Sequence, residues 1–208
     1  MKSILTNPSV LLFTFALGVA AVFGVYSLIG RKAPETVKAP IMYKAENGGD
    51  IAAIYSEIFR EEGYRVSEVL INDRTASDFI FEGMAKDRVI AVGTPDMFAS
   101  YLDNNRERTH INEYFADRPQ VVFWTKEMSE ATFGENVPES WKVFHSQHPG
   151  IKGIVTFSGV GFNAAGDRAL VFFKYSANPL DALGTFFDMQ KASDGTWYVL
   201  YKKDLWAA

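Results

Sequence analysis

The chain has 208 residues and no cysteine. This absence excludes disulfide bonds, a thiol nucleophile and zinc sites with thiolate ligands. It leaves the redox compartment of the protein open. The sequence contains no pattern that predicts a cofactor.

The sequence also has no excess of basic side chains. It contains 21 lysines and arginines against 25 aspartates and glutamates, a formal net charge of −4. Lys2 is the only charged residue before Arg31, so the acidic excess belongs to the later part of the chain. Lys and Arg drive binding to nucleic-acid phosphates. We therefore predict that nucleic acid is not a partner.

Charge is absent from Ile4 to Gly30. A hydrophobic segment of roughly 20 residues is long enough to cross a bilayer as a helix. A cleaved signal peptide is the alternative, but its apolar core is typically about 7–15 residues long, and here the apolar run continues to Ile29. We predict a retained transmembrane anchor over residues 1–30 that contacts the lipid bilayer through residues 5–29. The protein would then be a single-pass protein of the cell membrane.

Two signals for the orientation of this anchor disagree. Arg31, Lys32, Lys38 and Lys44 outnumber Lys2, which by the positive-inside rule keeps the following domain in the cytoplasm. A short tail before a signal-like helix, however, usually stays inside and sends the rest of the chain across. We predict an extracytoplasmic domain and keep the cytoplasmic one as the alternative.

The stretch after the anchor reads as a tether followed by one domain. Two prolines and mixed charge between Arg31 and Pro40 predict an extended Pro/Ala tether over residues 31–42. The remaining residues, 43–208, suit a single domain with a sizeable core.

Apolar spacing after Gly49 predicts the clearest helix of this domain. Asp50 is placed to accept hydrogen bonds from its first free amides, and Gly63 is placed to end it. A second helix start is Thr94-Pro95-Asp96, and residues 138–145 suit a further helix. The apolar stripe of the first helix recurs at i, i+3, i+4, i+7 and i+8 and consists of Ile51, Ile54, Tyr55, Ile58 and Phe59.

From Gly153 onward the pattern is typical of strands. Residues 153–163 and 169–175 are joined by a short turn with a glycine, and residues 185–191 and 196–202 form a second hairpin. We predict an α+β fold with helices packed on an antiparallel sheet of about five strands. A cone-shaped, nuclear-transport-factor-like sheet is a variant of the same prediction.

The C-terminal half carries a set of motifs between Trp141 and Trp206. They are Trp141-x-x-Phe144, Pro149-Gly150, Gly153, Phe157-Ser158-x-Val160-Gly161-Phe162-Asn163, Ala169-Leu-Val171, Gly184 and Lys191…Gly195-x-Trp197. In these motifs the chain resembles a group of uncharacterised secreted or membrane-anchored bacterial proteins. The resemblance implies an N-terminal helix before a strand-rich half, and no activity. Members often carry a cysteine pair in the loop that here reads Ala177–Gly184, from which this chain departs.

Two motifs suggest chemistry only weakly. His145 and His148 could turn both imidazoles toward one metal ion. Because Pro149 follows directly and further ligands are not evident, a solvated helix end is the favoured interpretation. Ser158 lacks the Gly-x-Ser-x-Gly setting of a nucleophile elbow, so its neighbouring glycines indicate a bulge or bend.

The polar residues Asp73, Arg74 and Thr75 follow a predicted strand. They could line a cleft with Asp181 or Asp188, in which carboxylates divide acid and base roles. An ordinary Asx-turn is the favoured alternative.

We predict a non-catalytic binding or interaction module whose ligand is an unknown protein or small molecule. Its candidate binding residues are Asn178, Pro179, Asp181, Gly184 and Asp73. The alternative is a membrane-tethered hydrolase that uses histidine and carboxylates in a cleft.

An enzyme of this kind should bring a histidine within hydrogen-bond reach of a carboxylate or serine. The histidines are His110, His145 and His148, and the partners are Asp73, Asp181 and Ser158.

Overall fold

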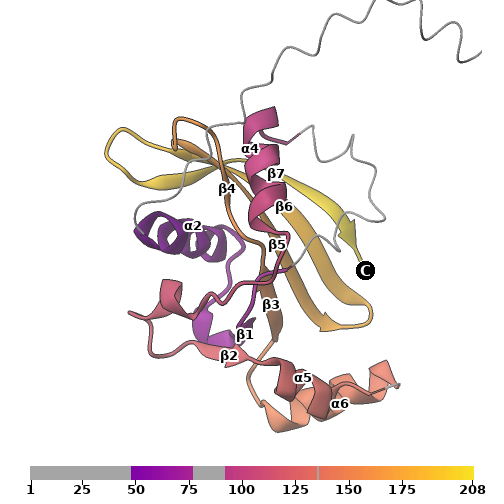
Figure 1. Ribbon diagram of the computed structural model, residues 1–208. Helices are drawn as coiled ribbons and strands as arrows, with labels where there is room; N and C mark the ends of the chain where they lie inside the picture. Colours follow the sequence, from indigo (N-terminus) through magenta and orange to yellow (C-terminus); the bar gives the residue numbers. More distant parts are fainter. Residues whose placement is uncertain (1–47, 77–91, 135) are drawn as a thin grey trace, which may run out of the picture. The chain divides into compact units, whose positions relative to one another are not determined.

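The computed structural model describes residues 48–76, 92–134 and 136–208, all of which lie in the unit Pro40–Ala208. The predicted anchor at residues 1–30 and the tether at residues 31–42 lie outside the described residues. Within the described ranges, no helix has the length and hydropathy needed to span a membrane. These ranges form an α+β fold with four α-helices and a seven-stranded sheet (Figure 1).

The described helices precede the long strands in the chain, as predicted. The helices are α2 (Gly48–Glu61), α4 (Pro95–Asn104), α5 (Lys126–Thr132) and α6 (Val137–Gln147), with the 3₁₀ turns η1 (Val66–Glu68) and η3 (Asn112–Phe115). The strands are β1 (Val69–Asn72), β2 (Val122–Trp124), β3 (Gly153–Phe157), β4 (Gly161–Phe162), β5 (Arg168–Asn178), β6 (Asp181–Lys191) and β7 (Trp197–Ala207).

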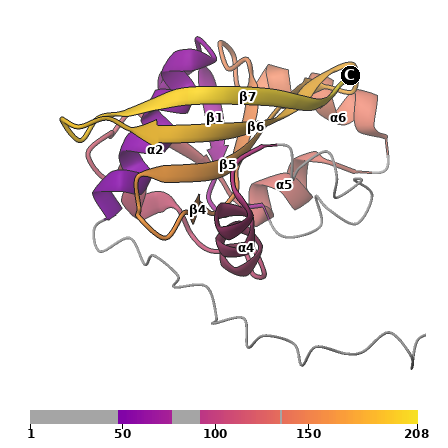
Figure 2. The ribbon, with the colours of Figure 1, turned by 90° about the horizontal axis from the view of Figure 1, so that it is seen from above.

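The sheet has the strand order β2-β1-β3-β5-β6-β7, and β4 pairs separately with β5. The prediction of an antiparallel sheet of about five strands is confirmed only in part, because β1 pairs in parallel with both β2 and β3. Parallel neighbours need a long crossover connection, and helices lie in the chain between these three short strands. The other pairs are antiparallel, and Figure 2 shows β5, β6 and β7 side by side.

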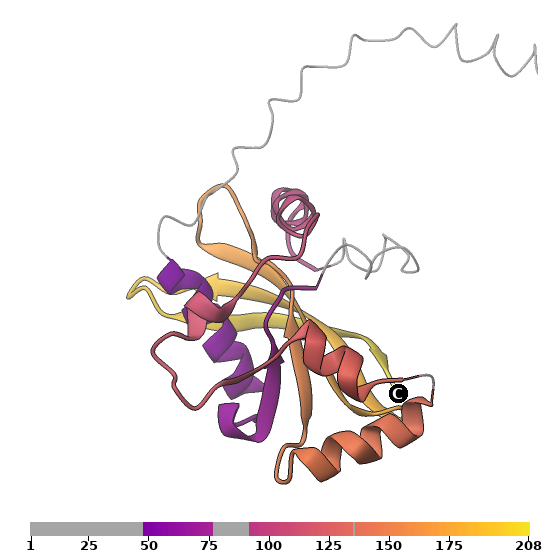
Figure 3. The ribbon, with the colours of Figure 1, turned by 60° about the horizontal axis from the view of Figure 1, so that its bottom comes forward.

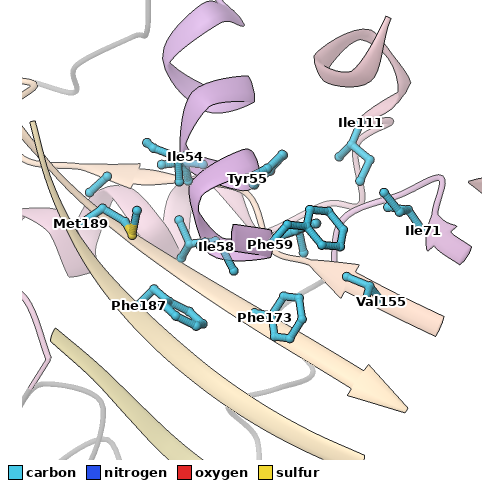
Figure 4. Close-up of a cluster of buried hydrophobic side chains, with 14 of the residues drawn as sticks. Ile54, Tyr55, Ile58, Phe59, Ile71, Ile111, Val155, Phe173, Phe187 and Met189 are labelled. Atoms are coloured by element: carbon cyan, nitrogen blue, oxygen red, sulfur yellow. The ribbon is translucent and has the colours of Figure 1, made fainter. Parts of the chain in front are cut away.

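One face of the sheet packs against α2. The predicted stripe of this helix is buried or half-buried, and it meets side chains that alternate along β5, including Val171 and Phe173. Such alternation places every second residue of a strand on the same face. Phe173 lies 6.5 Å from Phe59 and 6.1 Å from Phe187 between ring centroids (Figure 4). This face carries the largest buried cluster.

The opposite face packs against the remaining helices in two separate places. Leu170 and Phe172, which alternate with the residues facing α2, form one cluster under α4. Leu70 and Ile154 form a second cluster with residues of α6. Figures 1 and 3 show α4 and the α5–α6 pair toward different ends of the strands.

The first turn of α2 is attached to the far hairpin of the sheet. The prediction that the Asp50 side chain accepts hydrogen bonds from the first free amides of the helix is wrong. The Asp50 carboxylate instead accepts hydrogen bonds from Lys191 Nζ at 2.8 Å and Trp197 Nε1 at 2.9 Å. The Lys191 ammonium also lies 5.6 Å from the centre of the Trp197 ring. This contact joins α2 to the β6–β7 hairpin across 147 positions of sequence.

Candidate functional site

A polar row crosses the face that carries α4, α5 and α6. Thr156 of β3 lies directly opposite Lys174 of β5, and Asn72 of β1 donates a hydrogen bond from Nδ2 to Thr156 Oγ1 at 2.6 Å. Opposite residues share a face of the sheet, so the row lies between the cluster with Ile154 and the cluster with Phe172. The apolar lining of this face is interrupted here.

A cavity of about 410 Å³ opens over this row. We call it the basic pocket. Its described lining residues are Asn72, Asp73, Arg74, Thr75, Ala76, Arg108, Lys126, Ser129, Thr156 and Lys174. They come from the carboxyl end of β1 and the segment after it, from α5, which follows the parallel strand β2, from β3 and β5, and from the segment after α4. In open sheets with parallel strands, ligands bind beyond the carboxyl ends of those strands.

The segment that follows β1 is held by backbone hydrogen bonds on both sides. Asp73 N donates to Trp124 O at 3.1 Å, and Ala76 N donates to Phe157 O at 2.8 Å. Thr75 N donates to Thr109 O at 2.8 Å, and Thr109 N returns a bond to Thr75 Oγ1 at 2.9 Å. The pocket wall is therefore preorganised by the sheet and by the segment that carries Arg108.

The pocket concentrates positive charge in a chain that is acidic as a whole. Four of its described lining residues are cationic, and one, Asp73, is a carboxylate. Among the described residues, Arg74, Arg108 and Lys174 form no ion pair. Lys126 lies 3.4 Å from the exposed Glu130, a surface pair that contributes little. Within residues 48–76, 92–134 and 136–208, three of the four cations of the pocket thus have no carboxylate in an ion pair with them.

The cluster of cations in the pocket changes the pKa of Lys174. The pocket walls remove part of the hydration of its ammonium, and the nearby Arg108 guanidinium repels it, so the pKa of Lys174 lies below its ordinary value. Lys174 still keeps solvent exposure. An anion in the pocket would oppose both effects.

A histidine and a carboxylate meet at the edge of the pocket. His110 Nδ1 lies 3.7 Å from Asp73 Oδ2, and the His110 side chain is 61 % exposed. Arg74 and His110 form an isolated antiparallel bridge that places the two segments together. The distance suits an electrostatic contact, whereas a hydrogen bond needs about 3.2 Å or less.

The structure places the predicted binding residues in three separate positions. Asp73 lines the basic pocket, whereas Asn178, Pro179 and Asp181 form the turn between β5 and β6. Asn178 Oδ1 accepts a hydrogen bond from the Leu180 amide at 2.8 Å, which closes that turn. Gly184 lies opposite Lys174, where a Cβ atom would meet the Trp206 ring at 2.6 Å. A binding role of the turn stays a prediction.

The two histidines considered as metal ligands, His145 and His148, contact other groups of the fold. His145 Nε2 lies 2.9 Å from Ala177 O, and His148 lies edge-on to Trp124 at 5.7 Å. No group of three potential metal ligands occurs within residues 48–76, 92–134 and 136–208.

Ser158 is 0 % exposed, donates a hydrogen bond to Gly159 O and accepts one from the Phe172 amide. Asp188 is not beside Asp73 but pairs with Arg168.

Sequence reasoning found Asp73, Arg74 and Thr75 but missed the cations that face them. Lys174 had a detectable signal, because it is the only charged residue in the apolar run from Ala169 to Tyr175. Arg108 and Lys126 carry no such signal, since both stand in polar segments.

No family model, no curated protein and no solved structure matches this chain. The resemblance to secreted or membrane-anchored bacterial proteins stays a prediction.

Proposed function

We propose that the domain is a non-catalytic binding module whose basic pocket takes a small anionic ligand. One observation carries the proposal: cations from β5, from the segment after β1 and from the segment after α4, which form no ion pair with any described residue, converge on one cavity. Unbalanced like charges destabilise a folded protein, so an arrangement of this kind is expected where a ligand neutralises it. A volume of about 410 Å³ falls within the range of roughly 300–1,000 Å³ for small-molecule sites.

Calorimetric titration of the full chain in an uncharged detergent tests this proposal. Inorganic phosphate, at constant ionic strength, is the simplest probe. We expect Arg108→Ala and Lys174→Met to weaken its binding by about tenfold or more, because each removes a charge-assisted contact. Two exposed residues outside the pocket, each in an ion pair, supply matched controls: Arg106→Ala and Lys142→Met. Equal binding by all five proteins, or no binding by the parent chain, would contradict the proposal.

A hydrolase is the second candidate, favoured by the contact between His110 and Asp73 at the pocket edge. In that case His110 would serve as a general acid or base and Asp73 would orient it. Release of phosphate from a phosphate monoester is the assay. An activity that His110→Ala removes while phosphate binding persists would establish the hydrolase. If the parent chain binds phosphate but does not hydrolyse the phosphate monoester, the hydrolase proposal is excluded and the binding module remains.

We also propose that residues 5–29 tether this module to the cell membrane and that it lies outside the cytoplasm. The support is the uncharged run from Ile4 to Gly30. Protease treatment of intact cells is the test. Cleavage of the domain is expected, and its protection until the cells are lysed would contradict the orientation.

The cone-shaped, nuclear-transport-factor-like form of the sheet is a finer proposal. It is supported by α2, which packs on one face of the long strands β5, β6 and β7. An experimental structure of the full chain would decide it.

A further inference from the structure

The cations of the basic pocket stand at two opposite sides of it. Lys174 belongs to β5, whereas Lys126 follows β2 at the start of α5. In the sheet order β2-β1-β3-β5, two strands separate them. Three strand spacings of roughly 4.8 Å place the outer strands about 14 Å apart. Both residues line the pocket, so their charges belong to different parts of it.

Each of these lysines has an arginine near it. Arg108 repels Lys174, which contributes to its lowered pKa. Arg74 and Lys126 each stand two positions beyond Asn72 and Trp124, which are partners on the adjacent strands β1 and β2, and both line the pocket. Hydrogen bonds from the backbone and from Thr125 are the main causes of the lowered pKa of Glu127, and the charges of Lys126 and Arg74 add to them. The pocket therefore contains two cationic subsites, Arg108 with Lys174 and Arg74 with Lys126.

The middle of the pocket is neutral and polar. The inner strands β1 and β3 contribute Asn72 and Thr156, whose side chains are joined by a hydrogen bond. Asp73 adds an acceptor that suits a ligand hydroxyl. The described lining has no aromatic side chain on which a nucleobase could stack. These features fit an aliphatic, hydroxyl-bearing ligand between two charged ends.

We propose that the basic pocket binds a small molecule with two phosphate groups separated by an uncharged, hydroxyl-bearing segment. This inference rests on the proposed function of the pocket in anion binding. A phosphate monoester carries a charge of about −1.5 to −2 at neutral pH, so each pair of cations matches one phosphate. Two carboxylates would leave half of the positive charge without a partner.

Fructose 1,6-bisphosphate, fructose 6-phosphate and fructose are suitable probes for calorimetry on the full chain. We expect the bisphosphate to bind about ten- to a hundredfold more tightly than the monophosphate, and fructose to give no heat. Lys126→Met and Lys174→Met should each lower the affinity for the bisphosphate to about that for the monophosphate. Lys142→Met should retain the difference.

Equal affinity for the two sugar phosphates would overturn the two-subsite inference while anion binding stands. Absence of binding to inorganic phosphate and to both sugar phosphates would overturn the proposed function as well. A preference for the bisphosphate that survives Lys126→Met and Lys174→Met would also overturn the inference, because the second phosphate would then bind elsewhere.

Two phosphates joined by a hydroxyl-bearing segment also occur in a lipid headgroup. Cardiolipin and phosphatidylglycerol, dissolved in the same detergent, separate the two sources. The phosphates of cardiolipin are diesters with one negative charge each, whereas the monoesters of the sugar bisphosphate carry about −1.5 to −2. We therefore expect the sugar bisphosphate to bind more tightly, and tighter binding of cardiolipin would overturn the charge match. If neither bisphosphate binds more tightly than its single-phosphate partner, the inference fails.

Discussion

The two faces of the sheet are built differently. The face under α2 carries one continuous cluster of twenty buried residues among those described. The opposite face carries two clusters, of six and five buried residues, with Asn72, Thr156 and Lys174 between them. Burial of apolar area contributes about 25 cal/mol per Å², so the continuous face is the main source of stability.

The opposite face, which we call the divided face because polar residues separate its two clusters, carries polar side chains at positions where apolar side chains could have been buried. Lys174 is flanked along β5 by Phe173 and Tyr175, which both face α2, so the strand itself is well suited to a core. Lys174 is exposed, but partial loss of hydration and repulsion by Arg108 lower its pKa, so its charge lowers stability slightly. Positions that lower stability without structural benefit are the expected places for function. The comparison therefore assigns stability mainly to one face and supports the proposed binding of a ligand on the other.

Truncation in the continuous core should have the largest effect. Phe173→Ala removes a ring that is 0 % exposed and is expected to lower the free energy of unfolding by about 3–5 kcal/mol. Phe186→Ala, in the six-residue cluster of the divided face, should cost less because its smaller surroundings relax more easily. Urea denaturation measures both. A larger loss of unfolding free energy for Phe186→Ala than for Phe173→Ala would contradict the conclusion that the face under α2 is the main source of stability.

The attachment of α4 to the divided face should be the next most sensitive. A Cβ atom at Gly161 would lie 2.5 Å from the backbone of Tyr101, so α4 must move away in Gly161→Ala. We expect a loss of about 2 kcal/mol. Gly134→Ala is the control, since a Cβ there meets nothing within 4 Å. Unchanged thermal stability of Gly161→Ala would show that α4 is only loosely attached.

The link between α2 and the hairpin should be pH-dependent. Burial opposes ionisation of Asp50, but hydrogen bonds from Lys191 and Trp197, together with the Lys191 charge, outweigh it and hold the pKa of Asp50 below its ordinary value. A depressed carboxyl pKa stabilises the fold above the unfolded value of about 3.9, and this contribution is lost as pH falls through the folded pKa.

Asp50→Ala is therefore expected to cost about 1–2 kcal/mol at pH 7 and progressively less below about pH 4. Denaturation of both proteins across this pH range measures the difference. Glu139→Ala removes an exposed ion pair with Lys142 and serves as the control. A loss that stays constant down to pH 2 would exclude the ionic part of the contact.

The smallest effect should have the opposite sign. Lys174→Met removes a cation that is partly desolvated and repelled by Arg108. Because the residue is exposed and solvent screens its charge, we expect a gain of only about 0.5 kcal/mol at pH 7, together with weaker phosphate binding. A lysine with a lowered pKa destabilises the fold below its folded pKa, and this penalty is relieved as pH rises toward about 10.4. The gain should therefore shrink in alkali. A loss of stability at pH 7 would break the assignment of this face to function.

Local patterns were informative where one element decides its own structure. The stripe of α2 and the start of α4 after Thr94 follow from helical periodicity and from proline at the first helical position, and both are confirmed. The hairpin around residues 192–195 is also confirmed, with longer strands than predicted. The parallel pairing of β1 with β2 and β3 was missed, because three- to five-residue strands carry no signal for their neighbours.

The sequence by itself determined which residues form helices and strands and which side of each is apolar, because those properties repeat over 2 or 3.6 residues. Only the tertiary structure decided that Arg74, Arg108, Lys126 and Lys174 share one cavity. These residues span a hundred positions and meet through strand order and parallel pairing, which local periodicity does not encode. The core could therefore be predicted from the sequence, whereas the basic pocket could not.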